Sequence, residues 1–146
     1  MATIKLPPDF KEFLKLLNSN EVEYLLIGGY AVGYYGYPRP TGDMDIWIGT
    51  QRENAKRLVV ALEEFGFASS LEVFLEKNKV VRMGVPPFCL EILTTIDGVN
   101  FSECYGERTH VVLDEIEVNL ISLTHLKANK KASGRLKDLN DLENLP

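Results

Sequence analysis

Asp43 and Asp45 stand two residues apart at the head of an apolar run, residues 46–48, and this pair limits the folds open to the chain more than any other feature. In a strand, residues two apart project from the same face, so the two carboxylates would lie side by side. Apolar side chains on both faces beyond the acids indicate a central, buried strand. Neighbouring carboxylates repel each other unless a positive group lies between them. A divalent cation such as Mg²⁺ supplies that charge and prefers oxygen ligands.

An Asp-x-Asp pair has ordinary explanations too: the acids could lie in a solvated loop, cap a turn, or pair with Arg39 and Arg52. A second feature favours the metal site. The apolar run 24–27 ends at Gly28 and Gly29, which predicts a buried strand that turns tightly into a short helix. Backbone N–H groups at such glycines can approach phosphates closely. A phosphate-binding turn followed by a metal-binding acid pair is typical of proteins that act on nucleoside triphosphates.

Other phosphate and metal motifs do not fit the sequence. No lysine follows the glycines at the spacing of a P-loop. Tyr30 occupies the middle position of a GxGxxG motif whose ends would be Gly28 and Gly33. An EF-hand would need an oxygen ligand where the sequence has Trp47. These three classes of site are therefore excluded.

The remaining patterns predict one domain, residues 1–146, of mixed α/β (α+β) class. Strands are expected over 24–27, 43–48, 79–83 and 88–94, and as a hairpin within 110–122 that turns at Asp114-Glu115. Helices are expected over 7–20, 30–37 and 51–67, and from residue 123 onward with a break near Gly134. This order predicts a single mixed sheet covered by helices on at least one face.

Composition narrows the function classes. The hydrophobic fraction of 45% in 146 residues is enough for one sizeable core. The net charge of −5 argues against bulk electrostatic binding of nucleic acid. Cys89 and Cys104 are the only cysteines, which predicts reduced thiols rather than a metal set or a disulfide. No stretch has the apolar length of a signal peptide core or a membrane span, so we expect a soluble, cytoplasmic protein without a membrane partner.

The glycine pair and the acid pair together resemble the DNA polymerase β-like nucleotidyltransferase superfamily. There a glycine pair follows one strand, an Asp-x-Asp pair opens the next, and a third carboxylate lies on a neighbouring strand. Residues 28–48, with the pattern GG…R.T.D.D, are most similar to small nucleotidyltransferases of toxin–antitoxin and abortive-infection systems. Residues 81–87, 90–99 and 119–145 resemble that group as well, so the likeness extends over nearly the whole chain after residue 20.

This resemblance implies a polymerase β-like fold and transfer of a nucleoside monophosphate from a triphosphate such as ATP to an acceptor hydroxyl, with release of pyrophosphate. Asp43 and Asp45 would bind Mg²⁺ or Mn²⁺, together with Glu91 where the superfamily usually has aspartate. Asp97 is a weaker candidate for the third acid because it lies in an expected turn. The implied nucleotide-binding residues are Gly28, Gly29, Tyr30, Arg39, Thr41 and Lys130.

Several alternatives stay open. Arg39 equally fits the surface of a proline-rich turn. One or two side chains of the basic run 127–137 could reach a triphosphate or an RNA backbone, although a solvated helix face is the usual explanation of such a run. The whole protein could be a catalytically inactive module that binds a nucleotide or a partner protein in a toxin–antitoxin-like system. The acceptor could be tRNA, a protein hydroxyl or a small molecule, and a partner chain or a second copy could supply its binding surface. A glycosyltransferase would need a larger nucleotide-sugar domain.

Overall fold

The computed structural model describes residues 4–38 and 42–146. Over these residues the strands form one sheet of six, in the order β3-β4-β2-β1-β6-β5. They are β1 (Tyr24–Ile27), β2 (Met44–Ile48), β3 (Val80–Val85), β4 (Phe88–Leu93), β5 (Thr109–Leu113) and β6 (Ile116–Leu120). β1 is antiparallel to β2 but parallel to β6, and β2 is parallel to β4. The sheet is therefore mixed, as the sequence predicts.

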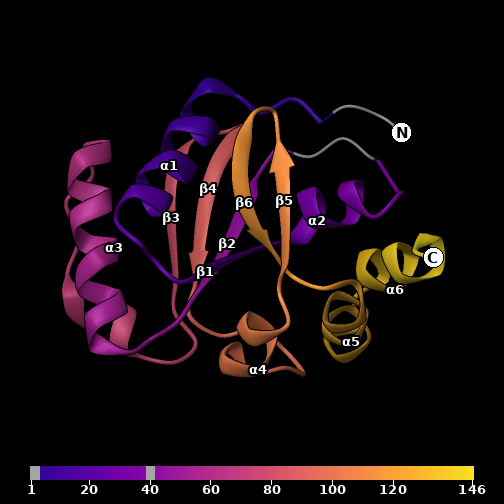
Figure 1. Ribbon diagram of the computed structural model, residues 1–146. Coiled ribbons are helices and arrows are strands. Elements are labelled where there is room, and N and C mark those ends of the chain that lie inside the picture. The colour runs from indigo at the N-terminus through magenta and orange to yellow at the C-terminus, as the bar shows by residue number, and fades with distance from the viewer. Residues whose placement is uncertain (1–3, 39–41) are drawn as a thin grey trace.

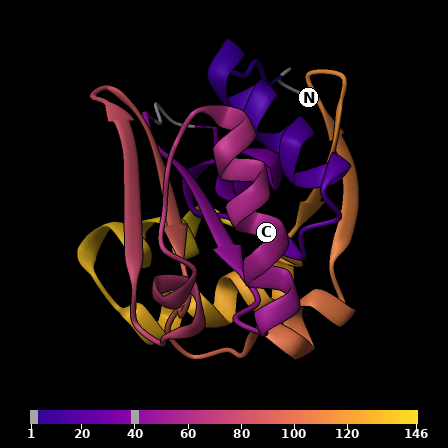
Figure 2. The same cartoon turned by 90° about the vertical axis from the view of Figure 1, so that its left-hand side faces the viewer.

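Helices cover both faces of this sheet. They are α1 (Pro8–Ser19), α2 (Gly28–Tyr34), α3 (Arg52–Phe65), the 3-10 helix η1 (Leu71–Leu75), α4 (Phe101–Gly106), α5 (Leu123–Ser133) and α6 (Leu136–Asn144). α1 and α3 pack side by side over one face, whereas α5 and α6 pair with each other on the opposite side (Figures 1 and 2). No helix in the described part of the chain is both long and apolar enough to cross a bilayer.

The core lies mainly between the central strands and the helices α1 and α3. All four residues of β1 are buried, and Met44, Ile46 and Ile48 of β2 are completely shielded from solvent. The apolar face of α1 meets them through residues at helical spacing, Phe10, Phe13, Leu14 and Leu17. β2 is thus held rigidly from one side, which leaves its other face to present Asp45 and Trp47.

Most predicted elements are confirmed, with small shifts at their ends. The strand expected at residue 43 begins at Met44, so Asp43 lies just before β2. The helix expected from residue 30 begins at Gly28, so both glycines belong to its first turn. The hairpin turns at Asp114 and Glu115, which both have positive φ. The fold class, a mixed sheet covered by helices, is as predicted.

Two short helices, η1 and α4, were not predicted from the sequence. Both are short, at five and six residues, so neither shows a full turn-to-turn hydrophobic repeat. A local signal for α4 does exist, because the Asn100 side chain accepts a hydrogen bond from the Glu103 N–H at 2.9 Å. Phe101 of α4 packs edge-on against Trp47, with ring centroids 5.2 Å apart. The helix therefore covers the part of the sheet next to the acid pair.

Candidate active site

The strand register brings the predicted acids together. Asp45 on β2 lies directly beside Glu91 on β4, because the two strands are parallel and these residues are in register. Asp43 precedes β2 by one residue, and its carboxylate lies near enough to affect the ionisation of Asp45. Three carboxylates, two on the neighbouring strands β2 and β4 and one just before β2, thus lie close together.

Arg82 on β3 lies among these acids, and the sequence reading missed it. It is the cross-strand partner of Glu91. Its Nη2 is 3.3 Å from Oδ2 of Asp43, and its Nη1 is 3.3 Å from Oε1 of Glu91. The side chain is 58% exposed, so it has room to leave this position. The guanidinium therefore pairs with Asp43 and Glu91 but not with Asp45.

Asp45 has the most perturbed electrostatics of the three acids. Burial raises the pKa of its carboxyl to about 7, helped by a hydrogen bond and the charge of Glu91 and by the charge of Asp43; the charge of Lys137 lowers it. Its Oδ1 is buried and has no hydrogen-bond partner among the described residues. Near neutral pH the site therefore holds negative charge that the surrounding protein compensates only in part.

The chemistry of this site fits a hard cation. Carboxylate oxygens are the donors that Mg²⁺ and Mn²⁺ prefer, and the unpaired Oδ1 of Asp45 offers one. As they stand, however, no three His, Cys, Asp or Glu side chains of the described chain are arranged to hold a metal ion. Arg82 already engages Asp43 and Glu91. A metal that bound all three acids would have to replace it.

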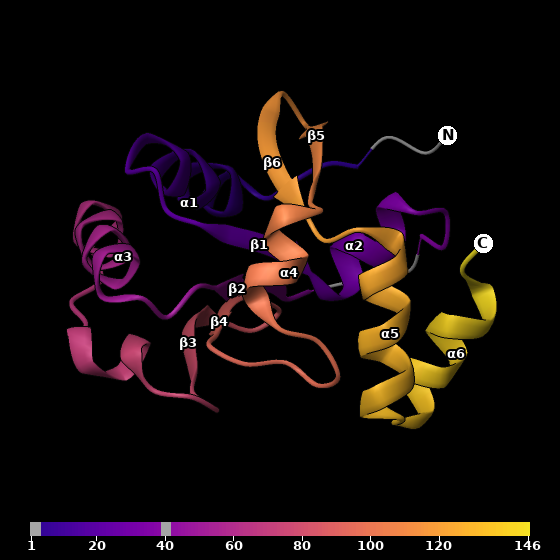
Figure 3. The ribbon, with the colours of Figure 1, turned by 60° about the horizontal axis from the view of Figure 1, so that its bottom comes forward.

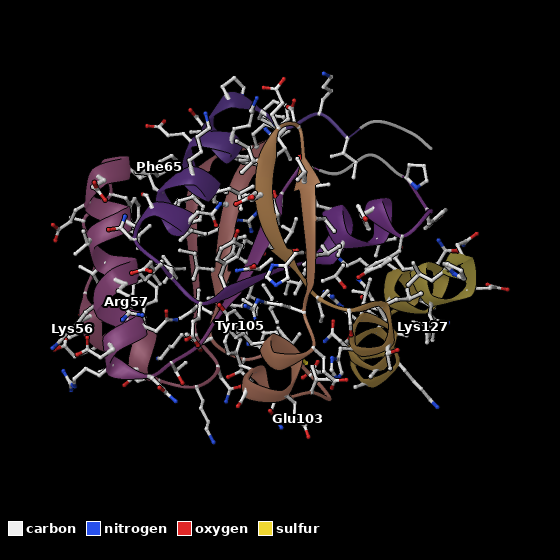
Figure 4. The ribbon with its side chains drawn as sticks, in the orientation of Figure 1. Lys56, Arg57, Phe65, Glu103, Tyr105 and Lys127 are labelled. Carbon is white, nitrogen blue, oxygen red and sulfur yellow. The ribbon has the colours of Figure 1, made fainter. Side chains whose placement is uncertain are left out.

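This competition leads to a prediction for Arg82→Gln. The variant should bind Mn²⁺ more tightly than the wild type, by roughly threefold to tenfold, because the ion no longer displaces an exposed guanidinium from two carboxylates. Titration of free Mn²⁺ by electron paramagnetic resonance measures the affinity. Arg57→Gln is the matched control, since Arg57 is exposed on α3, away from α5 and α6 (Figure 4). Equal or weaker Mn²⁺ binding by Arg82→Gln would contradict the competition.

Gly28 lies against the buried acid. Its φ is +67°, a value that only glycine adopts readily. A Cβ at this position would overlap Oδ2 of Asp45 and come within 3.1 Å of its Cγ. Ile27, the preceding residue, is the register partner of Asp45 across β1 and β2. Glycine is therefore needed here both for the backbone turn and for the close approach of the carboxylate.

A cleft of about 390 Å³ opens beside these groups. The predicted residues that line it are Gly28, Gly29, Asp45, Glu91 and Lys130. The opposite wall comes from the loop after β4 and from α5 and α6, which lie side by side (Figure 3). Its volume is in the range of small-molecule sites. The glycine pair, two of the acids and a group of bases therefore share one cavity.

Several cleft residues were not predicted as site residues. Thr95, Asn129, Ser133, Arg135 and Lys137 all line the cavity. All but the first lie in or beside the basic run, for which a solvated helix face was the usual explanation. No short-range pattern distinguishes a helix face that borders a cleft from one that borders open solvent, so the sequence offered no clear signal for them.

Lys130 lines the cleft but is tied into the protein. It is only 5% exposed, and its Nζ lies 3.2 Å from Asp138 and 3.2 Å from Asp141. Arg135 also contacts Asp138, with Nε 2.6 Å from Oδ2. Burial alone would raise the pKa of Asp138, but hydrogen bonds from Arg135, Ser133 and Lys130 hold it well below its usual range. Asp138 and Asp141 therefore neutralise part of the basic run.

We expect Lys130→Met to lower the free energy of unfolding by about 3–5 kcal/mol, because it removes the ammonium that two buried carboxylates share. Urea denaturation followed by circular dichroism measures the loss. Lys131→Met is the control, because the neighbouring lysine is exposed and should tolerate the same change. A loss below about 1 kcal/mol at Lys130 would show that the buried network is not stabilising.

The other predicted nucleotide-binding residues lie elsewhere. Tyr30 is 9% exposed, packs edge-on against Phe10 at 6.0 Å between ring centroids, and does not line the cleft. Arg39 and Thr41 lie outside the described residues. Asp97, the weaker candidate for the third acid, lines the cleft, and its backbone carbonyl accepts a hydrogen bond from Asn129.

Comparison with known proteins identifies the fold. No protein-family model matches the sequence, and no curated protein matches it significantly. Among solved structures, that of a "putative nucleotidyltransferase (TM1012)" from Thermotoga maritima superimposes with a TM-score of 0.63. The two chains are 17% identical, and the match covers 92% of this chain and 88% of the other. The chain therefore has the nucleotidyltransferase fold, which confirms the fold class predicted from its sequence.

Proposed function

We propose that this protein is a metal-dependent nucleotidyltransferase, which moves a nucleoside monophosphate from a triphosphate to an acceptor hydroxyl. The observation that carries the proposal is the convergence of Asp43, Asp45 and Glu91 beside a cleft that the glycine pair also lines. Nucleotidyl transfer needs positive charge at the reacting phosphate and a surface that admits the rest of the triphosphate. The acids can recruit that charge as metal ions, and the glycines leave the surface open.

Each group has a defined part in this reaction. Asp43, Asp45 and Glu91 would hold Mg²⁺ or Mn²⁺, which supplies charge neutralisation and activates the acceptor hydroxyl. Gly28 and Gly29 present backbone to the cleft without a side chain, so phosphate oxygens can approach their N–H groups. The acceptor oxygen would form a bond to the α-phosphorus as the bond to the pyrophosphate breaks. The buried strand β2 keeps Asp45 in place throughout.

A second candidate is a catalytically inactive module that binds a nucleotide or a partner protein. Arg82 favours it, because its guanidinium engages two of the three acids that the metal would need. Glu91 favours it too, since the extra methylene changes the reach of the third acid relative to aspartate. In this case the cleft would still admit a nucleotide, but no transfer would follow.

The deciding experiment supplies the protein with each α-³²P-labelled nucleoside triphosphate, Mg²⁺ or Mn²⁺, and a total cell extract that contains RNA. We expect label to move onto RNA, protein or a small molecule with the wild type, and not with Asp43→Asn, which should still fold. The labelled fraction then names the acceptor class. Transfer by Asp43→Asn at the wild-type rate would refute the metal assignment. Metal-dependent nucleotide binding without any transfer would favour the inactive module.

The proposed reaction also requires a surface that binds the acceptor. The cleft holds one small ligand, so an acceptor such as tRNA or a protein would contact surface outside it. A partner chain or a second copy of this protein, as in toxin–antitoxin pairs, could provide that surface. Size-exclusion chromatography with light scattering, before and after addition of the labelled acceptor, would test for such an assembly.

A further inference from the structure

Among the described residues, three basic side chains line the cleft, and two of them are already neutralised. Lys130, Arg135 and Lys137 all line it. The ammonium of Lys130 is shared between Asp138 and Asp141, and the guanidinium of Arg135 binds both carboxylate oxygens of Asp138. For either group to bind an anion strongly, it would have to give up a carboxylate that is almost fully buried.

Lys137 differs from both. It lies in the first turn of α6, its side chain is exposed, and it makes no ion pair or hydrogen bond within residues 4–38 and 42–146. It lines the same cavity as Gly28, Gly29 and Asp45, so its ammonium lies on the wall of the cleft that carries α6. Among the described residues, Lys137 is therefore a cleft cation without an ion-pair partner.

The acidic lining of the cleft makes an unpaired lysine important for binding a triphosphate. Asp45, Glu91 and Asp97 line the same cavity, and of these Arg82 pairs with Glu91, so without a metal the cavity keeps the negative charge of Asp45 and Asp97. When a triphosphate enters together with a divalent cation, that cation neutralises the carboxylates. The remaining charge of the triphosphate needs a cation on the protein, and an ammonium with three free donors supplies it.

We propose that Lys137 is the residue that binds the triphosphate of the substrate in this cleft, in place of the buried Lys130 that the family resemblance favours. The inference rests on the proposed function for the presence of a nucleoside triphosphate. Lys137 acts on phosphate oxygens and not on the base. Lys130 instead fixes α5 against α6, and so holds the wall from which Lys137 extends.

Isothermal titration with ATP and with inorganic tripolyphosphate, both in Mg²⁺, tests the assignment. Lys137→Ala should weaken binding of both ligands about tenfold or more, because a charge-assisted hydrogen bond is lost. Lys137→Arg should retain most of the affinity, and Lys131→Ala, an exposed change on α5, should retain all of it. The thermal midpoint of Lys137→Ala should lie close to that of the wild type, since the side chain makes no ion pair or hydrogen bond among the described residues.

The outcomes separate this inference from the proposed function. Unchanged tripolyphosphate binding by Lys137→Ala would overturn the assignment, whether or not ATP binding falls. Wild-type protein that binds neither ligand with Mg²⁺ would overturn the assignment together with the proposed function. If ATP binding depends on Lys137 but no label is transferred to any acceptor, the proposed transfer activity is refuted, whereas the assignment of Lys137 is supported.

Discussion

Asp45→Asn is expected to reduce the rate of nucleotidyl transfer by on the order of 10³-fold. At the same time it should stabilise the metal-free protein at pH 8. The loss of activity follows because the proposed mechanism needs this carboxylate to hold the metal. The gain in stability follows because Asp45 is buried beside Glu91, so its negative charge is costly in the absence of a cation. The amide of asparagine is neutral, and its N–H can donate to Glu91.

The pH dependence of stability follows from the direction of the shift. The pKa of Asp45 is about 7 in the folded protein against 3.8 in the unfolded chain, so between these values the folded state binds more protons. Stability of the metal-free wild type should therefore fall as the pH rises from about 4 to about 7. The whole change is roughly 2–4 kcal/mol. Asp45→Asn should not show this fall, so its advantage should grow across the same range.

Urea denaturation in EDTA at pH 5 and at pH 8 measures the stability gain of Asp45→Asn and the pH dependence of the wild-type stability. Asp97→Asn, a change at an exposed acid of the same cleft, should follow the wild-type dependence. Saturating Mn²⁺ should remove the disadvantage of the wild type at pH 8, because the ion compensates the charge. Parallel curves for wild type and Asp45→Asn in EDTA would show that Asp45 is not the group that titrates.

Gly28→Ala is the second change with a large expected effect. Alanine at φ +67° costs about 1–2 kcal/mol, and the added Cβ also overlaps the Asp45 carboxylate. Because β1 and β2 are buried and cannot move apart readily, the carboxylate itself has to shift. We expect a total loss of about 3 kcal/mol in unfolding free energy, and transfer below detection.

Gly66→Ala separates the two contributions. Gly66 has φ +95° at the end of α3, and a Cβ there would meet nothing within 4 Å. It should therefore show the backbone cost alone and leave transfer unchanged. Chemical denaturation and the labelled-transfer assay, applied to both variants, provide the comparison. If Gly28→Ala were no less stable than Gly66→Ala and still bound Mn²⁺ normally, the close packing against Asp45 would have no functional role.

The sequence predicted the fold well because its strongest patterns are local. The strand at residues 24–27 is marked by an apolar run and a glycine stop, and α3 by helical spacing and Gly66. The nearness of Glu91 to Asp45 could be expected only through the family resemblance. Nothing in the two segments specifies that β2 and β4 are parallel neighbours in this register, which is a property of the whole sheet.

The parts of the site that escaped prediction depend on tertiary contacts. Arg82 occupies an unremarkable position in β3 until the hairpin register places it beside Glu91. Among the five bases of residues 127–137, the sequence does not reveal which are neutralised, because Asp138 and Asp141 select Lys130 only once α5 and α6 have packed. Tyr30 is next to the glycine pair in the sequence, yet its ring faces the core and packs on Phe10.

The β3–β4 hairpin, residues 80–93, carries both Glu91 and the arginine that neutralises it, on facing positions at the border of the sheet. The other two acids belong to a different part of the chain. Exchange of this one hairpin between related proteins would thus replace an acid together with its counter-ion and leave the central strands untouched. Recombination or design at this border could change the charge beside Asp45, provided that the residues of the new hairpin at the buried positions of Leu90 and Ile92 still fit the core.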